Sequence, residues 1–542
     1  MGDGLGVTPP RWAGYRQALQ SWARSPFSRA NVPATIATMV LLVGLALRIW
    51  STEQARFSGE EAWFWSIGRD IATGTSFPVL GHPITGSSAR HPGAGFFYFL
   101  GLTQLAGPSP LAAYVAVSLG GWVALALLSL AIARAFDRAT GLAFLLLGTV
   151  SPWWVVYTNS AWPGYLLPTL CALVLICLAS IADRPAAGVA ARAGLAFLLV
   201  IGFQIHLSLL HTWLITMVVF ALLRPRLGRA FLIGAVIGVA CYVPYLIDEI
   251  RHGFSNTLAI AHRSQGGARS IAGLAGLLFD FVAFATTDVS YLWKQGFWRP
   301  FDPFAFYGGR GVAETAGFMA RGGPAPIGWA ALAVSWAFTV GAWIWFAATI
   351  RRRLRTGART TGNLLVVACL VAVAAIPLLY LLSGKGGYPH YVNAVLPLAL
   401  LPPALALGKL LAHRAARWGA VAYLILFAAG GFFALRGYYA VDSRWSVPQS
   451  TAAVAFILER TREPDGHQRP FRLEFGFGPS FPNSYALLAK HVFHAPFLAT
   501  GAASDTFRVD ARAPDQPAPA ETDSLVLSTI VVRHLRQDDR PR

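Results

Sequence analysis

Charged residues and cysteines are scarce in this sequence, and both shortages narrow the class of protein. Only 13% of the 542 residues are charged, whereas soluble domains carry about 25%, which argues against an ordinary soluble fold. The four cysteines, at 171, 177, 241 and 369, lie inside apolar runs and form no CxxC pair. This placement argues against a disulfide framework and against a structural zinc site built on cysteine.

Several other sequence patterns are missing. The chain has no heptads, no internal repeat and no P-loop motif, which excludes coiled coils, repeat arrays and P-loop NTPases. More than thirty residues precede the first apolar run and no small-residue cleavage pattern follows it, so we expect no cleavable signal peptide. The formal charge is +19, but the arginines cluster in short loops between apolar runs, which indicates membrane topology and no nucleic-acid partner.

The apolar runs are too long and too numerous for a soluble chain, and they predict an all-α, polytopic membrane protein. Hydrophobic residues make up 55% of the sequence, and a spanning helix needs about 20 mostly apolar residues. We expect about eleven transmembrane helices, of which the third, fifth and sixth are short. They cover 33–50, 110–134, 139–155, 164–182, 193–206, 207–223, 229–247, 326–350, 363–382, 391–408 and 417–435. The fifth and sixth are compatible with a hairpin that does not fully cross.

Basic residues in the short loops set the orientation of these spans. Arginines cluster before the first span and then in alternate loops, for example at 134–138, 184–192 and 351–359. The loops between them have no Lys or Arg near 158–163, and Lys385 alone at 383–390. Because positive charge marks cytoplasmic loops, residues 1–32 are expected inside the cell. The odd number of spans then places the C-terminal segment outside.

Three regions are therefore predicted outside the membrane, at 51–109, 248–325 and 436–542. Residues 270–287 are apolar enough for a twelfth span, but a span there would move the 351–355 arginine cluster outside. We therefore expect an interfacial helix with Asp280 toward water. The last region combines two helix-like stretches, STAAVAFILERT and SYALLAKHVFH, with two strand-like ones, FRLEFGF and the late SLVLSTIVV, which predicts a small α/β extracytoplasmic segment.

Two adjacent carboxylates, Glu60 and Glu61, open an amphipathic segment in the first outer region. Acidic residues favour helix N-termini, so a structural role stays open beside a catalytic one. Neighbours on a helix point about 100° apart, so only one of the two can face a reacting atom. Arg56 stands shortly before the pair and is a candidate for substrate binding.

Polar residues at four other outer boundaries are further candidates for substrate binding. Structural explanations stay open for all of them, because basic residues anchor to lipid headgroups, Trp suits the membrane interface, and a lone His is often a packing residue. A Lys beside a glycine-rich helix start fits an anion site. The candidates are Arg90 and His91 in RHPGAGFFYFLGL, Trp162 in WPGYLLP, Gln204 and His206 in QIHLS, and Lys385, His390 and Tyr391 in SGKGGYPHYVNAVLP.

The order of these motifs resembles that of the GT-C membrane glycosyltransferases, in the group around protein O-mannosyltransferases and lipid A aminoarabinose transferases. The similarity covers most of 30–440 and rests on GEEA at 59–62, RHPGAGFFYFLGL, WPGYLLP, QIHLS and HYVNAVLP. It implies a transmembrane glycosyltransferase domain over 33–435, in a multi-pass protein of a bacterial plasma (inner) membrane. It further implies transfer of a hexosyl or pentosyl group from a polyprenyl-phosphate donor to a lipid, glycan or protein acceptor, at the extracytoplasmic face.

Within this resemblance, Glu60 matches the family's first acidic residue, which serves as catalytic base or orients the acceptor. The family more often has Asp there, and many members carry a second acidic residue or an Asn after the Trp-Pro helix start. Gly164 occupies that place here, which puts a two-carboxylate or metal-dependent site in doubt. The sequence requires no divalent metal, so the metal and any cofactor stay unknown.

The chemistry of the transfer agrees with this interpretation. An inverting displacement needs one carboxylate to take a proton from the acceptor, and cationic groups to stabilise the leaving phosphate. Two alternatives remain: a transporter or flippase of a lipid-linked sugar, and a non-catalytic protein of the same fold. Transporters tend to show repeats and ionisable residues at the midplane, and neither feature is prominent in this sequence.

Overall fold

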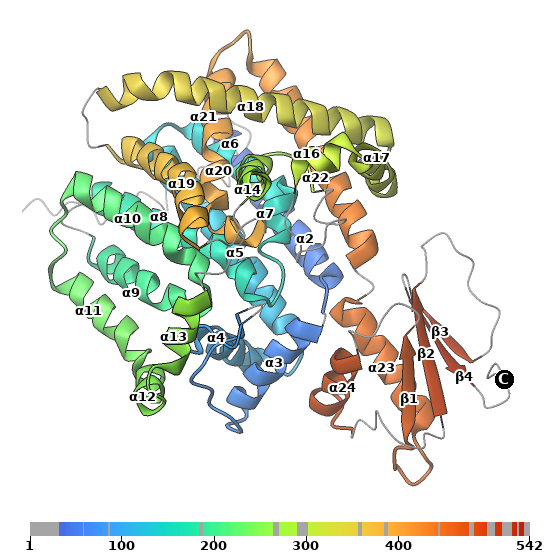
Figure 1. Ribbon diagram of the computed structural model, residues 1–542. Helices are drawn as coiled ribbons and strands as arrows, with labels where there is room; N and C mark the ends of the chain where they lie inside the picture. The colour runs from blue at the N-terminus through green and yellow to red at the C-terminus, as the bar shows by residue number, and fades with distance from the viewer. Residues whose placement is uncertain are drawn as a thin grey trace, which may run out of the picture.

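The computed structural model is a large helical body with one small sheet near the C-terminus (Figure 1). It describes residues 32–57, 59–84, 87–183, 188–263, 270–289, 302–355, 360–383, 389–442, 445–475, 482–495, 505–511, 523–527 and 530–535. The all-α membrane class with a small C-terminal α/β segment is confirmed.

Seven helical stretches in the described residues are long and apolar enough to cross a membrane. They are Val32–Gln54 (α2), Leu111–Ala135 (α5), Pro163–Asp183 (η2, Pro163–Leu166, and α8, Leu167–Asp183), Ala325–Ile350 in α18 (Ala325–Arg355), Thr361–Leu382 in α19 (Thr361–Ser383), Asn393–Ala412 (η5, Asn393–Val395, α20, Leu396–Ala399, and α21, Leu401–Ala412), and Arg417–Ala440 in α22 (Arg417–Asp442). An eighth is a pair, α11 (Gly228–Ala240) and α12 (Val243–Arg251), bent by 47°. The multi-pass architecture is thus confirmed, but the count of eleven is not.

The other three expected spans form shorter apolar helices, α6 (Arg138–Val150), α9 (Val189–Ile205) and α10 (Leu210–Leu223). The third expected span is divided because the chain turns at Ser151, whose hydroxyl accepts the Trp154 N–H at 3.2 Å as a new helix, α7 (Pro152–Val156), begins. The fifth and sixth are separated by an extended residue, His206, and the short helix η3 (Leu207–Leu209).

The expectation for Asp280 was wrong. It lies on α14 (Ile271–Ala283) with 0% of its surface exposed. α16 (Pro303–Gly308), α18 and α19 pack against this helix, although its first residue, Ile271, is 89% exposed. Its apolar pattern therefore reflects contacts with other helices, and Asp280 points into the protein.

The first outer region folds into two short helices, α3 (Gly59–Ala72) and α4 (Gly95–Thr103), the latter extended by η1 (Gln104–Ala106). Glycines let the two helices approach closely, since a Cβ at Gly68 would lie 2.7 Å from Leu100 Cβ. The second outer region contains α13 (Ser255–Arg263), α14, α16 and α17 (Gly311–Gly322), and η4 (Pro389–Tyr391) precedes the span at Asn393–Ala412.

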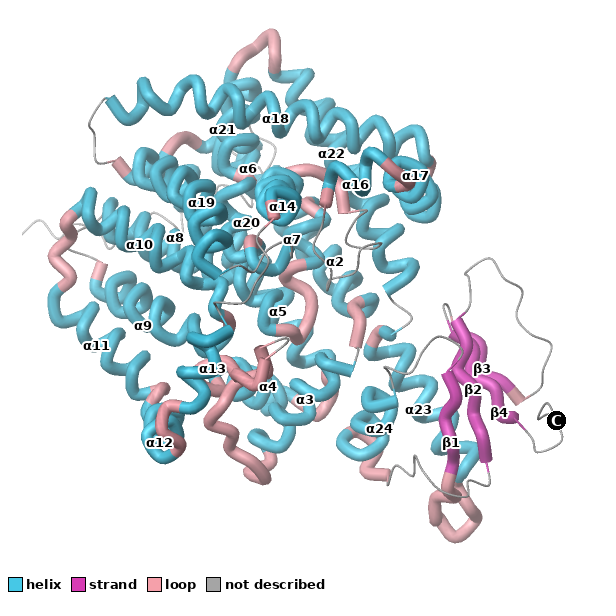
Figure 2. Tube along the Cα trace, viewed as in Figure 1, coloured by secondary structure: helices cyan, strands magenta, loops and turns pink. Residues whose placement is uncertain are grey.

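The C-terminal segment contains α23 (Val447–Thr461), α24 (Pro482–His491) and a four-stranded sheet, drawn in magenta in Figure 2. The strands are β1 (Phe471–Phe475), β2 (Asp505–Ala511), β3 (Ser524–Val526) and β4 (Ile530–Leu535), in the order β1-β2-β4-β3. Strands β1 and β2 are parallel, and the other two pairings are antiparallel. The sequence indicated both helices and β1, but not β2, and its single late strand is divided into β3 and β4.

The C-terminal segment packs on the first outer region through α24, which contacts α3. The Ser484 hydroxyl donates to the Phe57 carbonyl at 3.2 Å, and the His491 ring lies 5.7 Å from the ring of buried Trp65. This contact supports the side of α3 that carries Trp65, and so fixes the helix that carries the acidic pair.

Candidate functional site

A cavity of about 660 Å³ lies where the first outer region meets the helical body. One part of its lining is polar and comes from Glu60, His82, His91, Trp162, His206, His211, His390 and Tyr391. Another part is apolar and comes from Phe203, Leu207, Leu210, Ile260, Leu277, Ile376, Leu379 and Leu382. The cavity therefore combines a place for proton transfer and anion contact with a surface suited to a hydrocarbon chain.

The two adjacent glutamates occupy different environments. Glu60 lines the cavity and accepts a hydrogen bond from the Trp162 indole N–H at 3.1 Å. Glu61 is only 2% exposed and pairs with Arg56 at 3.5 Å. The expectation that only one of them can face a reacting atom therefore matches their placement, with Glu60 at the cavity and Glu61 turned into the protein.

Partial desolvation in the cavity raises the pKa of Glu60 above its usual value, although the residue keeps an exposed surface, and the negative charge of Glu61 acts in the same direction. The Trp162 N–H opposes this rise, because its hydrogen bond favours the charged carboxylate. A carboxylate with a raised pKa is a stronger base, and a general base works best when its pKa approaches the working pH.

Trp162 also accounts for the glycine two positions later. A Cβ at Gly164 would lie 2.1 Å from the Trp162 ring, so a side chain there would collide with the residue that holds Glu60. The Gly164 carbonyl accepts the Asn393 side-chain N–H at 2.7 Å, which ties this turn to the start of the span at Asn393–Ala412. The absence of a second acidic residue at 164 is thus a consequence of local packing.

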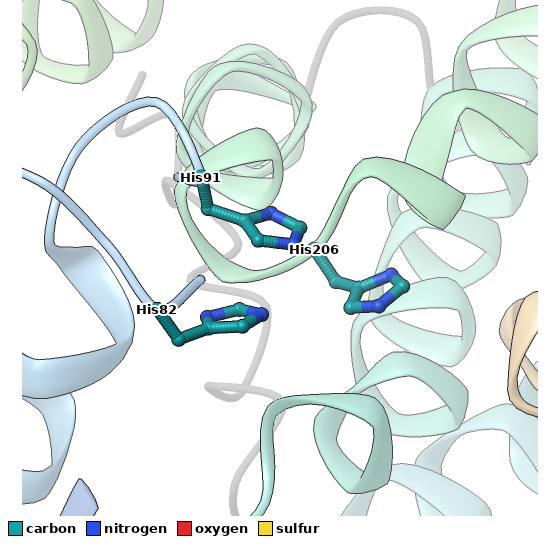
Figure 3. Close-up of side chains that lie close together, drawn as sticks. All are labelled: His82, His91 and His206. Atoms are coloured by element: carbon teal, nitrogen blue, oxygen red, sulfur yellow. The ribbon is translucent and has the colours of Figure 1, made fainter. Parts of the chain in front are cut away.

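Histidines make up most of the remaining polar lining. His206, Trp162 and His390 form a triangle of rings. The His206 centroid lies 6.2 Å from Trp162 and 6.1 Å from His390, and the other two centroids are 5.4 Å apart. His82 and His91 stack on each other with centroids 3.8 Å apart, and His91 lies 5.1 Å from His206 (Figure 3). Burial lowers the pKa of His206 to about 4, and burial followed by the proximity of His206 lowers the pKa values of His82 and His390 well below the usual value.

The structure brings some of the expected site residues to the cavity and places others beside it. Glu60, His91, Trp162, His206, His390 and Tyr391 line the cavity. Arg90 is joined through its backbone to Asn256 on α13, at 2.7 and 3.0 Å. Gln204 donates to the Cys241 carbonyl at 3.0 Å and packs against Gly93 and Gly95. Lys385 lies outside the described residues.

Two cavity histidines, His82 and His211, were not among the residues expected from the sequence. His82 could have been found, because GHP at 81–83 and RHP at 90–92 flank a Gly-Ser turn, which is a pattern typical of a hairpin. His211 lies on the first turn of α10, where its Nδ1 contacts the Ser208 carbonyl at 2.8 Å. A single histidine in an apolar helix gives no comparable signal.

Neither a protein-family model nor the sequence of a curated protein matches the chain. Among solved structures, ArnT from Cupriavidus metallidurans bound to undecaprenyl phosphate is similar, with a TM-score of 0.51 and 14% identity over 93% of this chain and 99% of that one. Its apo form gives the same TM-score and coverage at 13% identity. The oligosaccharyltransferase of Archaeoglobus fulgidus gives 0.46 and 14% identity over 89% of this chain and 66% of that one.

Proposed function

We propose a function that starts from the fold of this chain, which is that of the GT-C glycosyltransferases. From this premise and from the cavity, we propose that the protein transfers a sugar from a polyprenyl-phosphate donor to a hydroxyl-bearing acceptor at the extracytoplasmic face of a bacterial inner membrane. Glu60 is the general base of the transfer, and Glu61 supports it.

One observation carries this proposal: a single cavity joins an accessible carboxylate to an apolar surface formed by Leu210, Ile376, Leu379 and Leu382. A polyprenyl phosphate has the matching division, with a charged sugar phosphate at one end and a hydrocarbon tail at the other. The last three of these apolar residues lie on α19, which is a candidate span. The tail can therefore leave the cavity along a helix that is itself suited to lipid.

The reaction follows from the placement of the groups. Glu60 takes the proton of the acceptor hydroxyl as its oxygen bonds to the anomeric carbon of the sugar. The bond from that carbon to the phosphate oxygen breaks, and polyprenyl phosphate leaves with the bond electrons. The configuration at the anomeric carbon is inverted, and the transition state is oxocarbenium-like. His390 and Tyr391 line the cavity just before the span at Asn393–Ala412, and we expect them to contact the leaving phosphate.

The similarity to ArnT bound to undecaprenyl phosphate supports the class of donor, because the likeness extends over 93% of this chain. At 14% identity the likeness is one of fold, whereas the sugar and the acceptor are selected by individual side chains. We therefore propose the class of reaction and leave the sugar and the acceptor to experiment.

The test is incubation of the purified full-length protein with radiolabelled polyprenyl-phosphate sugars and a membrane extract that supplies acceptors. Movement of label to an acceptor supports the enzyme. Binding of the donor without transfer favours a non-catalytic protein of this fold, and neither binding nor transfer favours the transporter. Comparison of the glycolipids and glycoproteins of a deletion strain with those of its parent then identifies the product.

A further inference from the structure

Three histidines from two separate parts of the chain meet in the wall of the cavity. His82 and His91 come from the first outer region, and His206 comes from the junction of α9 and η3 (Figure 3). One ring nitrogen of each lies within 4.8 Å of the others, and all three residues are buried. In a tetrahedral zinc site with Zn–N bonds of about 2.0–2.1 Å, two ligand nitrogens lie about 3.4 Å apart, so the rings must close by up to about 1.4 Å around the ion.

A short hairpin holds the first two rings side by side. The His91 N–H donates to the His82 carbonyl at 3.0 Å, and the Gly81 N–H donates to the His91 carbonyl at 3.0 Å. The Ile84 N–H closes the hairpin by donating to the Ala89 carbonyl at 2.8 Å. Backbone pairing therefore holds the two histidines opposite each other, where their imidazoles stack.

Glycines allow this hairpin to approach the end of α9 closely, and the third histidine, His206, directly follows α9. A Cβ at Gly93 would lie 2.7 Å from Gln204 Cδ, and one at Gly81 would lie 2.6 Å from the Gly93 carbonyl oxygen. Gln204 is itself held by its bond to Cys241. The close approach leaves His206, two residues after Gln204, against the face of the hairpin.

From this geometry we propose that His82, His91 and His206 bind one transition-metal ion of the zinc class. Imidazole nitrogen suits Zn²⁺, Co²⁺, Ni²⁺ and Cu²⁺, whereas Mg²⁺ and Ca²⁺ require oxygen ligands. Three imidazoles around one ion also match the three-protein-ligand pattern of open zinc sites. The proposal concerns a site without carboxylates, and its residues are distinct from the Glu60 base.

Two further features bear on metal binding. The His82 Nδ1 atom is buried and has no hydrogen-bond partner among the described residues. A buried polar nitrogen without a partner is costly, and a cation bound among the rings would supply one. The His206 Nδ1 atom accepts the Ser208 N–H at 3.1 Å. Binding through Nε2 therefore moves the ring proton to Nδ1 and breaks that bond.

All three ligands line the cavity, so the remaining coordination position opens into it. A small anion or a substrate oxygen entering the cavity can take that position. The proposal that a substrate oxygen takes this position rests on the proposed function. The metal site itself does not.

The experiment is titration of the tag-free, chelator-treated, full-length protein with Co²⁺, whose visible d–d bands report the coordination. We expect one tightly bound equivalent, and an altered spectrum when inorganic phosphate or azide is added. His82→Asn and His206→Asn remove ligands from different elements. Each should weaken Co²⁺ binding at least about 100-fold, since loss of supporting residues alone costs about 10–100-fold in other sites.

His390→Asn is the matched control, because His390 is buried in the same cavity but lies outside the three. It should bind Co²⁺ as the wild type does. The thermal midpoint, measured at each Co²⁺ concentration of the same titration, shows whether each variant is folded. Only proteins with an intact site should be stabilised by the metal. Absence of a stoichiometric site in the wild type would overturn the proposal, as would unchanged binding in both ligand variants.

The same preparation separates this proposal from the proposed function. Co²⁺ binding without sugar transfer supports the metal site and counts against the transferase. Transfer by protein that has no Co²⁺ or Zn²⁺ site supports the transferase and counts against the metal site.

Discussion

Glu60 and Glu61 are neighbours in the chain, but only Glu60 lines the cavity, so their substitutions should have different effects. Glu60→Gln keeps the size and the hydrogen-bonding shape, and we expect turnover to fall by about 10²–10⁴-fold, as when a positioned general base is lost. Glu61→Gln removes one partner of the Arg56 pair, and should lower the unfolding free energy by about 1 kcal/mol with a smaller effect on turnover. Turnover and thermal midpoint of both variants check this, and a larger turnover loss at Glu61 would reverse the assignment.

The hydrogen bond from Trp162 makes a prediction about pH. A base must be ionised to act, so turnover should fall as the pH drops through the raised pKa of Glu60. The Trp162 N–H lowers that pKa, and Trp162→Phe removes it, so the acid limb of the pH–rate profile should move to higher pH. Trp63→Phe, in the lining of the same cavity, is the control and should leave the limb in place. A shift to lower pH in Trp162→Phe would exclude Glu60 as the titrating base.

Lys385 stays a prediction from the sequence, because it lies outside the described residues. In the sequence, Lys385 follows α19 and precedes His390, which is buried in the lining of the cavity. Loss of one charge-assisted contact to the donor phosphate costs about 1.5–3 kcal/mol. Lys385→Ala should therefore raise the apparent donor KM by about one to two decades, with the thermal midpoint unchanged. An unchanged KM would remove Lys385 from the site.

At the scale of elements, the hairpin at 81–91 depends on Gly93, which has φ +93° and no room for a side chain. Gly74 is the matched control, since it has φ +74° but nothing within 4 Å of the place that a Cβ would occupy. Alanine at either site strains the backbone, whereas only Gly93→Ala also collides with Gln204. We expect Gly93→Ala to be less stable than Gly74→Ala by about 1–3 kcal/mol, the usual cost of overpacking. Equal thermal midpoints would show that the hairpin does not pack on α9.

The sequence could predict those features of the fold and the site that are determined by residues close together in the chain. The long spans, the separation of Glu60 from Glu61, and the helices α3, α23 and α24 follow from periodicity and helix geometry within a few residues. The meeting of His82 with His206 does not, because it depends on glycines that let a distant hairpin approach α9. Asp280 was placed wrongly for the same reason: an apolar face that packs on protein has the same pattern as one that lies in lipid.

At the scale of the molecule, the parity of the crossings decides which side the cavity faces. The seven long helices and the bent pair α11–α12 give up to eight candidate crossings among the described residues, and an even number of crossings would return the C-terminal segment to the cytoplasm. α9 and α10 are consecutive, so together they do not change the parity whether or not they cross. The side of the C-terminal segment therefore depends on α6 and α7, which are separated at Ser151 and Pro152.

We predict that α6 and α7 cross the membrane together as one broken span. The basic residues support this, because Arg134 precedes α6 and Arg138 is its first residue, Arg192 lies at the start of α9, and the turn at 158–163 between them has no Lys or Arg. Alkaline phosphatase fused after residue 160 or after residue 440 should then be active, and the same enzyme fused after residue 136 should be inactive. A fluorescent reporter that folds only in the cytoplasm should give the opposite pattern at the three positions. Because α24 packs on α3, the C-terminal segment and the cavity share one side, so cytoplasmic activity after residue 440 would place Glu60 inside the cell and remove the basis for an extracytoplasmic transfer.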